Sequence, residues 1–342
     1  MWGLATMNLM SMNKRSAFLV TMVFSLVSGG CAPEPDLEPE AIVVAEPLLE
    51  SSPAYPAADI PVFSTEHIAN KGFYYAGGEY VGDPPIMGGQ MYVEVWEPRE
   101  ATQPYPLLMF HGNGQTGVDW LQTPDGRPGW AYYLVEQGYT LYMVDYPARG
   151  RSTYIPGGEH GDLGIRTAEQ LETIWTNVGE KGNFPLQDNH SQWPGGGHRG
   201  DPIFDNFIKT QVQFAGQSTT MARYAAMELL DTIGEPVILI THSQGGGVGW
   251  GVADGRPELV RGIVTIEPGG PQIGNVNTAE VVYSGRASNA YGPVNYPLTY
   301  DPPVSDPSEI MTYLEDSSDQ PGEVPCYLQQ EPARQLVNMI DM

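Results

Sequence analysis

The stretch PVILITHSQGG, Pro236–Gly246, decides the fold of this chain of 342 residues. Its first part, Val237–Ile240, is short and apolar, which is typical of a strand buried on both faces of a parallel sheet. A serine between such a strand and a run of glycines is the pattern of a sharp strand-to-helix turn, which presents the serine hydroxyl at the edge of the sheet. The stretch therefore predicts an α/β fold with an exposed nucleophile, Ser243.

The residues around Ser243 meet only part of what such a turn requires. A serine hydroxyl is a weak nucleophile at neutral pH, so a neighbouring base must take its proton as it attacks. The turn needs small residues on either side of the serine. Gly245 supplies one of them, whereas Thr241 stands where a glycine is usual. The alternative interpretation is a serine whose hydroxyl only satisfies a turn.

Strands and helices alternate along most of the chain. Strands separated by helices predict βαβ units, and hence a mostly parallel sheet with helices on both faces. Between residues 152 and 214 the pattern lapses into Gly, Pro, Trp and His, which predicts a cap insertion over the sheet. The expected strands are Gly72–Tyr80, Gln90–Trp96, Leu107–Phe110, Thr140–Val144, Val237–Ile240 and Val260–Ile266, and the expected helices are Trp130–Gln137, Ser218–Thr232 and one from Gln244.

Two segments are candidates for an oxyanion hole. Attack on a carbonyl carbon places negative charge on oxygen, and preorganised backbone N–H groups stabilise that charge. One donor is expected to be the N–H of Gln244, directly after the nucleophile. The other is expected from the loop after Leu107–Phe110, which contains Gly112 and Asn113.

The same loop contains a second motif. Gly112, Gly114 and Gly117 spell G-x-G-x-x-G after a strand, which is the pattern of a dinucleotide-binding turn. That motif must open a helix, but Pro124 and Pro128 follow too soon for a helix to run. We therefore expect no nicotinamide or flavin cofactor at this loop.

Glu267 is the candidate for the third member of a catalytic triad. The acid that orients the base is expected at the end of the strand after the nucleophile, and Glu267 closes Val260–Ile266. A buried strand end rarely carries a carboxylate without a partner. A functional role is therefore favoured over a solvated surface position.

Together these segments resemble the α/β-hydrolase superfamily. The resemblance rests on the sharp turn at Ser243, which we call the elbow, and on four further segments. These are the His111–Gly112 loop, TPDGR at Thr123–Arg127 with GWA after it, VDYPARGRS at Val144–Ser152, and HSQWPG at His190–Gly195. More narrowly, the chain from about Gly72 onward is similar to exported bacterial esterases whose triad acid is glutamate. This resemblance implies Ser243 as nucleophile, Glu267 as triad acid, oxyanion donors from Gly112–Asn113 and Gln244, and hydrolysis of small carboxylic esters without metal or organic cofactor.

The base histidine of that family has no counterpart at the expected place. The family's histidine follows the last strand of the sheet, but no histidine follows His242 here. Related esterases also pair a cysteine near Cys326 with a later one. We therefore expect a truncated chain that lacks the last strands and is inactive or weak. The alternative bases, His111, His190, His198 and His242, are less well placed.

The first thirty residues, 1–30, are typical of an export signal. Asn13–Arg15 supplies positive charge, and Ser16–Val27 supplies an apolar stretch too short to span a bilayer. Ser28–Cys31 resembles a bacterial lipobox, with serine in place of the usual leucine. Both a lipidated Cys31 and ordinary cleavage remain open, so the protein is predicted to be secreted, periplasmic or anchored to the outer membrane.

The composition of residues 31–65 predicts a disordered tether before the hydrolase domain at 66–342. From Cys31 to Ile60 the chain has seven acidic residues, six prolines and no Lys or Arg. The whole chain has 16 Lys and Arg against 41 Asp and Glu, which disfavours nucleic acid or an anionic membrane surface as partner. Without Cys31 as partner, Cys326 suggests a missing segment, an intermolecular bridge or a free thiol.

The leading hypothesis is an exported esterase, and two other classes stay open. A non-catalytic surface lipoprotein could use the same fold to bind a ligand or partner, and an acyltransferase or lyase could use the same nucleophile. Trp120, Tyr132 and Trp193 are candidates for an apolar pocket, whereas helical spacing favours the core for Trp130 and Tyr133. A last helix is expected at Glu331–Met339.

Overall fold

The computed structural model describes residues 60–158, 160–182, 187–269, 275–277, 282–284, 290–315 and 326–339. The chain divides into Met1–Ala58 and Asp59–Met342, and only the second part contains described residues. The expected signal peptide, Cys31 and most of the expected tether lie outside the described residues.

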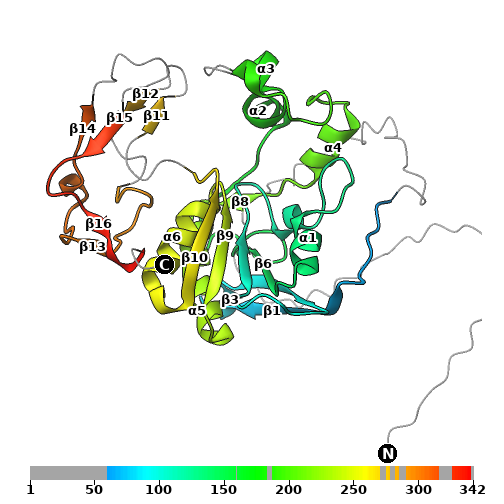
Figure 1. The fold of residues 1–342 in the computed structure, drawn as a ribbon, viewed down its shortest axis with the longest axis horizontal. Coiled ribbons are helices and arrows are strands. Elements are labelled where there is room, and N and C mark those ends of the chain that lie inside the picture. The colour runs from blue at the N-terminus through cyan, green and yellow to red at the C-terminus, as the bar shows by residue number, and fades with distance from the viewer. Residues whose placement is uncertain are drawn as a thin grey trace, which may run out of the picture. The chain divides into compact units, whose positions relative to one another are not determined.

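A six-stranded sheet forms the centre of the domain (Figure 1). β1 and β4 are antiparallel to each other, β4 is antiparallel to β6, and β6, β5, β9 and β10 run parallel. This arrangement confirms the predicted α/β sheet. In order across the sheet the strands are β1 (Ile68–Ala76), β4 (Met91–Pro98), β6 (Leu141–Asp145), β5 (Leu107–Phe110), β9 (Val237–His242) and β10 (Val260–Ile266).

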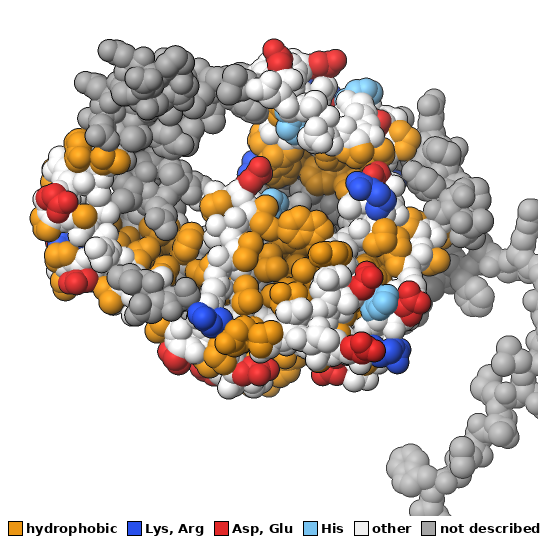
Figure 2. All heavy atoms as spheres, viewed as in Figure 1, with side chains coloured by type: hydrophobic (Ala, Val, Ile, Leu, Met, Phe, Trp, Pro, Cys, Tyr) orange, Lys and Arg blue, Asp and Glu red, His pale blue; other side chains and the backbone are white. Residues whose placement is uncertain are grey.

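Helices cover both faces of the sheet. α5 (Ser218–Ile233) and α6 (Gly245–Gly255) pack on one face, where Leu108 and Phe110 of β5 belong to their core cluster. Successive residues of a strand point to opposite faces. Leu107 and Met109 accordingly belong to the core on the other face, against α1 (Trp130–Glu136). Figure 2 shows hydrophobic side chains gathered in the middle of the face in view, with acidic side chains around the rim.

The helix ends follow the predicted stops, but the predicted burial of Trp130 and Tyr133 is wrong. Gly234 caps α5 in the left-handed region at φ +74°, where glycine has no steric penalty. Trp130 and Tyr133 are 53% and 62% exposed, because α1 turns Ala131 and Val135 toward the sheet instead. Helical spacing identifies a face of the helix, but it does not say which face lies inward.

Short elements fill the region between β6 and α5, which we call the cap segment (Ser152–Phe214). It has its own small core of Leu171, Phe204 and Phe207. In Figure 1 its helices lie beyond the ends of the central strands. Its elements are β7 (Leu163–Gly164), α2 (Ala168–Leu171), a π-turn (Glu172–Thr176), α3 (Val178–Lys181), a 3₁₀ turn (Gln187–Asn189), α4 (Pro202–Lys209) and β8 (Phe214–Ala215), which pairs with β7.

The residues after β10 form small antiparallel pairs outside the main sheet. The predicted helix at Glu331–Met339 is wrong, because the backbone of Gln335–Leu336 pairs with Tyr300–Asp301 and only one 3₁₀ turn, Val337–Met339, follows. None of the described helices is long and apolar enough to cross a membrane. Besides β7 with β8, the two-stranded pairs among the described residues are β2 (Glu79–Val81) with β3 (Ile86–Gly88), β11 (Asn275–Asn277) with β12 (Val282–Ser284), β13 (Tyr300–Asp301) with β16 (Gln335–Leu336), and β14 (Thr312–Glu315) with β15 (Cys326–Gln329).

Candidate active site

Ser243 lies in a strained turn between β9 and α6. Its φ is +50°, a conformation that a residue with a side chain adopts only where the surrounding structure enforces it. Its N–H donates to the carbonyl of Ile266 at 3.0 Å, and its own carbonyl accepts from the N–H groups of Gly246 at 3.0 Å and Gly269 at 2.7 Å. These bonds tie the turn to the end of β10 and hold the serine in place.

Glycines in α6 explain how the sequence forms this turn. A Cβ on Gly245 would lie 2.9 Å from the carbonyl oxygen of Phe110 and from Tyr146 Oη, so no side chain fits there. A Cβ on Gly249 would lie 2.6 Å from the methyl group of Thr241. Thr241 stands where a glycine is usual, and its side chain fits here because Gly249 in α6 has no side chain.

Ser243 lines a cavity of about 500 Å³. Gln244 and Asn113 line the same cavity, together with Arg166 from the cap segment and Tyr296. Two of the predicted oxyanion residues thus share a cavity with the predicted nucleophile, Ser243. Neither Gly112 nor Glu267 is among the residues that line it.

Glu267 directly follows β10 and has a φ of +44°. The parallel register pairs Ile266 with His242, which places Glu267 beside the elbow. Burial lowers the pKa of His242, and the negative charge of Glu267 acts in the opposite direction. Glu267 itself is exposed, which differs from the buried strand end that we expected, because β10 is the last strand of the described sheet.

His111 supports the loop Gly112–Gly117, which is predicted to carry an oxyanion donor and is called the oxyanion loop below. Its Nδ1 donates to the carbonyl of Gly112 at 2.9 Å, and its Nε2 accepts from the N–H of Tyr146 at 3.4 Å. Complete burial, with the nearby charge of Arg149, lowers the pKa of His111 to about 3. This imidazole is neutral and structural, and it is not a free base.

Arg149 joins the two halves of the predicted oxyanion hole, and sequence reasoning missed it. Its Nη1 donates to the carbonyl of Gly112 at 3.1 Å and to Gln244 Oε1 at 3.2 Å, while Nη2 donates to Ser218 Oγ at 2.9 Å. Burial lowers the pKa of Arg149 to about 10. In the described part of the chain, none of its hydrogen-bond partners is a carboxylate. The only sequence signal was its place in Val144–Ser152.

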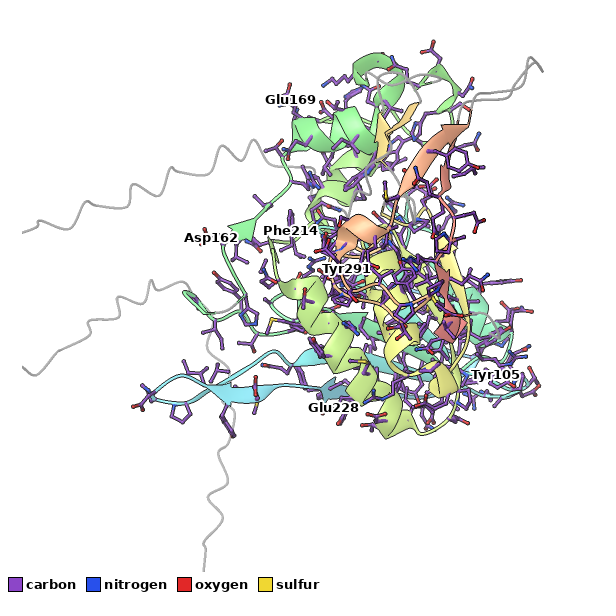
Figure 3. All side chains as sticks on the ribbon, turned by 90° about the vertical axis from the view of Figure 1, so that its left-hand side faces the viewer. Tyr105, Asp162, Glu169, Phe214, Glu228 and Tyr291 are labelled. Atoms are coloured by element: carbon purple, nitrogen blue, oxygen red, sulfur yellow. The ribbon has the colours of Figure 1, made fainter. Side chains whose placement is uncertain are left out.

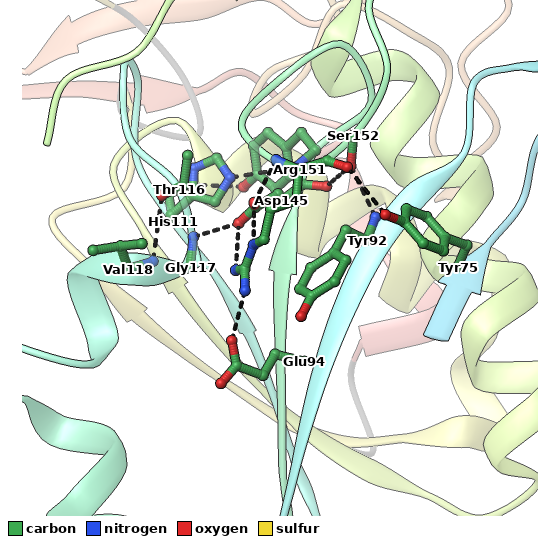
Figure 4. A network of polar contacts seen from close by, with 11 residues as sticks. Tyr75, Tyr92, Glu94, His111, Thr116, Gly117, Val118, Asp145, Arg151 and Ser152 are labelled. Carbon is green, nitrogen blue, oxygen red and sulfur yellow. Dashed lines mark hydrogen bonds and ion pairs between the residues drawn. The ribbon is translucent and has the colours of Figure 1, made fainter. Parts of the chain in front are cut away.

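A network around Asp145 fixes the other end of the oxyanion loop (Figure 4). The carboxylate accepts from the N–H of Gly117 at 2.8 Å and from Arg151 Nε at 2.8 Å. Arg151 also donates to Glu94 at 2.6 Å. Burial works against the charge of Asp145, but the hydrogen bonds from Arg151 outweigh it and lower the pKa of Asp145.

The cap segment contacts the oxyanion loop directly. Arg166 Nε donates to Asn113 Oδ1 at 3.2 Å, and the N–H of Val212 donates to the carbonyl of Gly114 at 2.8 Å. The Arg166 guanidinium lies 5.7 Å from the ring centre of Phe214. In Figure 3, Phe214 lies between the cap helices and α5. The cap segment is therefore bonded to Asn113 and Gly114, and it contributes Arg166 to the lining of the cavity.

The remaining candidates from the sequence lie elsewhere. No histidine of the described residues lines the Ser243 cavity, and His190 and His198 are exposed on the cap segment. The aromatic residues Trp120, Tyr132 and Trp193 pack in other clusters. Among the described residues no group of three or more His, Cys, Asp or Glu side chains has the spacing of a metal site.

A model of the alpha/beta hydrolase fold family matches residues 105–281. The chain is 39% identical over 274 residues to a "Probable secreted lipase phiG" of Fungal sp. (strain ATCC 74256), which covers 78% of this chain and 70% of that protein.

Solved structures give weaker similarities. A novel bacterial esterase is 23% identical with a TM-score of 0.48, over 63% of this chain and 73% of that one. A predicted CIB-like hydrolase from Thermoplasma acidophilum is 17% identical with a TM-score of 0.29, over 58% of this chain and 65% of that one.

Proposed function

Because the chain belongs to the alpha/beta hydrolase fold family, we propose that it cleaves carboxylic esters through an acyl-enzyme on Ser243. One observation carries this proposal: Ser243 adopts a φ of +50° directly after β9 and lines a cavity of about 500 Å³. Strain of this kind persists mainly at functional sites. The related secreted lipase supports an ester as the substrate.

The proposed reaction has two steps. Ser243 Oγ adds to the ester carbonyl carbon as a base takes its proton, and the tetrahedral intermediate then expels the alcohol, which takes up that proton. Water hydrolyses the resulting serine ester and restores the hydroxyl. The developing oxyanion accepts hydrogen bonds from Gln244 and from the Gly112–Asn113 loop. The positive N-terminal end of α6 stabilises the same charge.

Glu267 is the proposed acid that orients the base. Its place beside the elbow, at the end of the next strand, is the support for this role. Since no histidine of the described residues lines the cavity, we expect slow turnover from this chain. Loss of one triad member lowers the rate by several orders of magnitude even in an intact fold.

The same observation favours a second candidate function. A cavity that is lined by no histidine of the described residues suits a protein that binds an ester or a related ligand without cleaving it. In that case Ser243 contacts the ligand but forms no covalent bond. Covalent labelling therefore separates the two functions.

The test uses a fluorophosphonate probe and p-nitrophenyl butyrate. We expect the probe to label Ser243, as shown by peptide mass spectrometry, and the Ser243→Ala variant to lose both labelling and turnover. Ser191→Ala, at an exposed serine of the cap segment, is the matched control and should behave as the wild type. Turnover that persists in Ser243→Ala would rule the mechanism out.

We also propose that the chain is exported. The name of the related secreted lipase and the signal pattern of residues 1–30 support this. Lipidation at Cys31 is the accompanying proposal. In a bacterial host, intact-mass analysis should show loss of residues 1–30 and an acylated Cys31, and Cys31→Ser should release the protein from the membrane fraction. An unprocessed chain in the cytoplasm would contradict export.

A further inference from the structure

The charge of the Ser243 cavity is opposite to the charge of the chain. The chain has 16 Lys and Arg against 41 Asp and Glu. None of the residues that line the cavity in the described part of the chain is acidic, and the one charged residue among them is Arg166. A cationic cavity in so acidic a protein indicates selection for a ligand that carries negative charge.

Arg166 is fixed in place by neighbours that leave its charge unneutralised. Its Nε donates a hydrogen bond to Asn113 Oδ1 at 3.2 Å, and its guanidinium lies over the ring of Phe214. Its stem packs over Gly114, where a Cβ would lie 3.7 Å from Arg166 Cγ. None of the ion pairs among the described residues involves Arg166. A held guanidinium of this kind matches the geometry of a carboxylate.

Two further arginines strengthen the positive potential around the cavity. Arg149 lies behind the oxyanion loop, and its guanidinium is 5.7 Å from the same Phe214 ring. Arg223 lies 4.3 Å from the ring centre of Tyr296, which lines the cavity. Interactions between charges are screened less in such a partly enclosed space than at an open surface.

Resting on the proposed function, we propose that this cavity takes esters that carry a free carboxylate, such as monoesters of short dicarboxylic acids. Arg166 binds the free carboxylate while the ester carbonyl lies at Ser243. Because Arg166 contacts Asn113 and lines the same cavity as Ser243, we expect a short acyl chain to reach both groups. Attack then breaks the bond between the acyl carbon and the alcohol oxygen, and water releases the dicarboxylic acid.

The test compares two substrates of similar length that differ in charge. Mono-p-nitrophenyl glutarate carries the free carboxylate, and p-nitrophenyl butyrate does not. We expect the wild type to have at least a tenfold higher kcat/KM for the glutarate monoester. Arg166→Gln should reduce that preference at least fivefold, and Arg166→Lys should retain part of it. An equal loss on both substrates would mean that Arg166 serves the oxyanion of every ester, and it would overturn the proposal.

Arg261→Gln is the matched control for the loss of one positive charge. Arg261 is exposed on β10, faces the ring of Tyr105 and does not line the cavity. Its substitution should leave the substrate preference unchanged. Raising the salt concentration to about 1 M should weaken the preference of the wild type, because screening shortens the reach of the charge.

A binding measurement separates this proposal from the proposed function. Calorimetric titration of Ser243→Ala with monomethyl glutarate and with methyl butyrate needs no turnover. We expect at least tenfold tighter binding of the glutarate monoester, and loss of the difference when Arg166→Gln is added. If the wild type neither turns over esters nor reacts with the fluorophosphonate, this difference still decides the inference. Equal affinity for the two esters would overturn it.

Discussion

The loop after β5 and the end of β10 flank the same serine, but they are held in different ways. On the β5 side, buried polar side chains make a connected set of bonds around Gly112, through His111 and Arg149. On the β10 side, Glu267 is exposed, and Val264, two residues before the end of the strand, is 51% exposed. The β5 side is therefore held by hydrogen bonds from buried side chains, whereas the β10 side is held by strand pairing with β9 and by backbone hydrogen bonds that link Ser243 to Ile266 and Gly269.

The largest expected effect is on the β5 side, at Asp145. Asp145→Asn removes the carboxylate charge that pairs with the Arg151 guanidinium and accepts a hydrogen bond from the N–H of Gly117. Breaking a buried ion pair costs about 3–5 kcal/mol of unfolding free energy. We expect a loss of that order in urea unfolding followed by circular dichroism, and a smaller loss at acidic pH.

The pH dependence follows from the sign of the shift. Since the pKa of Asp145 is lowered in the folded state, its contribution is present above the carboxyl's ordinary range and fades as pH falls through the folded pKa. Glu94→Gln is the control, because Glu94 accepts from the same Arg151 but is less buried than Asp145. An Asp145→Asn loss below about 1 kcal/mol, the range of surface pairs, would contradict a preorganised loop.

A second effect concerns Asp119, in the 3₁₀ turn Gly117–Trp120 that ends the same loop. Burial, with the nearby charge of Asp145, raises the pKa of Asp119 to about 8. A raised carboxyl pKa means that stability is complete at low pH and is lost as pH rises toward 8. Asp119→Asn should therefore be more stable than the wild type at pH 8, by roughly 1–3 kcal/mol.

Thermal unfolding between pH 5 and pH 9 measures this difference. The gap between Asp119→Asn and the wild type should widen with rising pH. A gap that is constant over this range would mean that Asp119 stays ionised throughout.

A third effect tests whether Arg149 sets the oxyanion hole. Arg149→Met removes its bonds to Gly112, Gln244 and Ser218 while keeping much of its volume. We expect labelling of Ser243 by fluorophosphonate to slow by about tenfold, less than the effect of removing a donor itself. Hydrogen exchange at Gly112–Asn113 should rise in parallel. An unchanged rate of hydrogen exchange at Gly112–Asn113 in Arg149→Met would show that the conformation of the loop does not depend on Arg149.

The smallest effect is expected on the β10 side. Glu267→Gly relieves the strain of φ +44° but adds freedom to the unfolded chain, so the unfolding free energy should change by less than about 1 kcal/mol. Glu267→Ala, which keeps the strain, should be less stable than Glu267→Gly in the same urea experiment. A large loss in both variants would mean that Glu267 is as firmly bonded as the β5 side.

The sequence predicted those elements whose pattern is local. β5 at Leu107–Phe110 has the predicted bounds, because a short apolar run is itself the signal of a buried strand. β10 at Val260–Ile266 also has the predicted bounds, although it is a partly exposed edge strand. The end of α5 was predictable because Gly234 acts within one turn. The position of Ser243 at a turn was predictable for the same reason.

The sequence did not predict the contacts that come from distant segments. Arg149 bonds Gln244 across 95 residues, and Arg166 bonds Asn113 across 53 residues. Neither spacing leaves a periodic trace. The helix expected at Glu331–Met339 failed for the same reason, since its pairing partner, Tyr300–Asp301, is remote in sequence.

The fit between Thr241 and Gly249 shows that the elbow motif is defined by a volume and not by a fixed position. A relative with glycine at position 241 is free to carry a larger residue at 249, whereas this chain is not. The residues at positions 241 and 249 should therefore vary together among relatives. A search pattern that requires glycine two residues before the serine will miss family members in which the small residue is in the helix, as Gly249 is here.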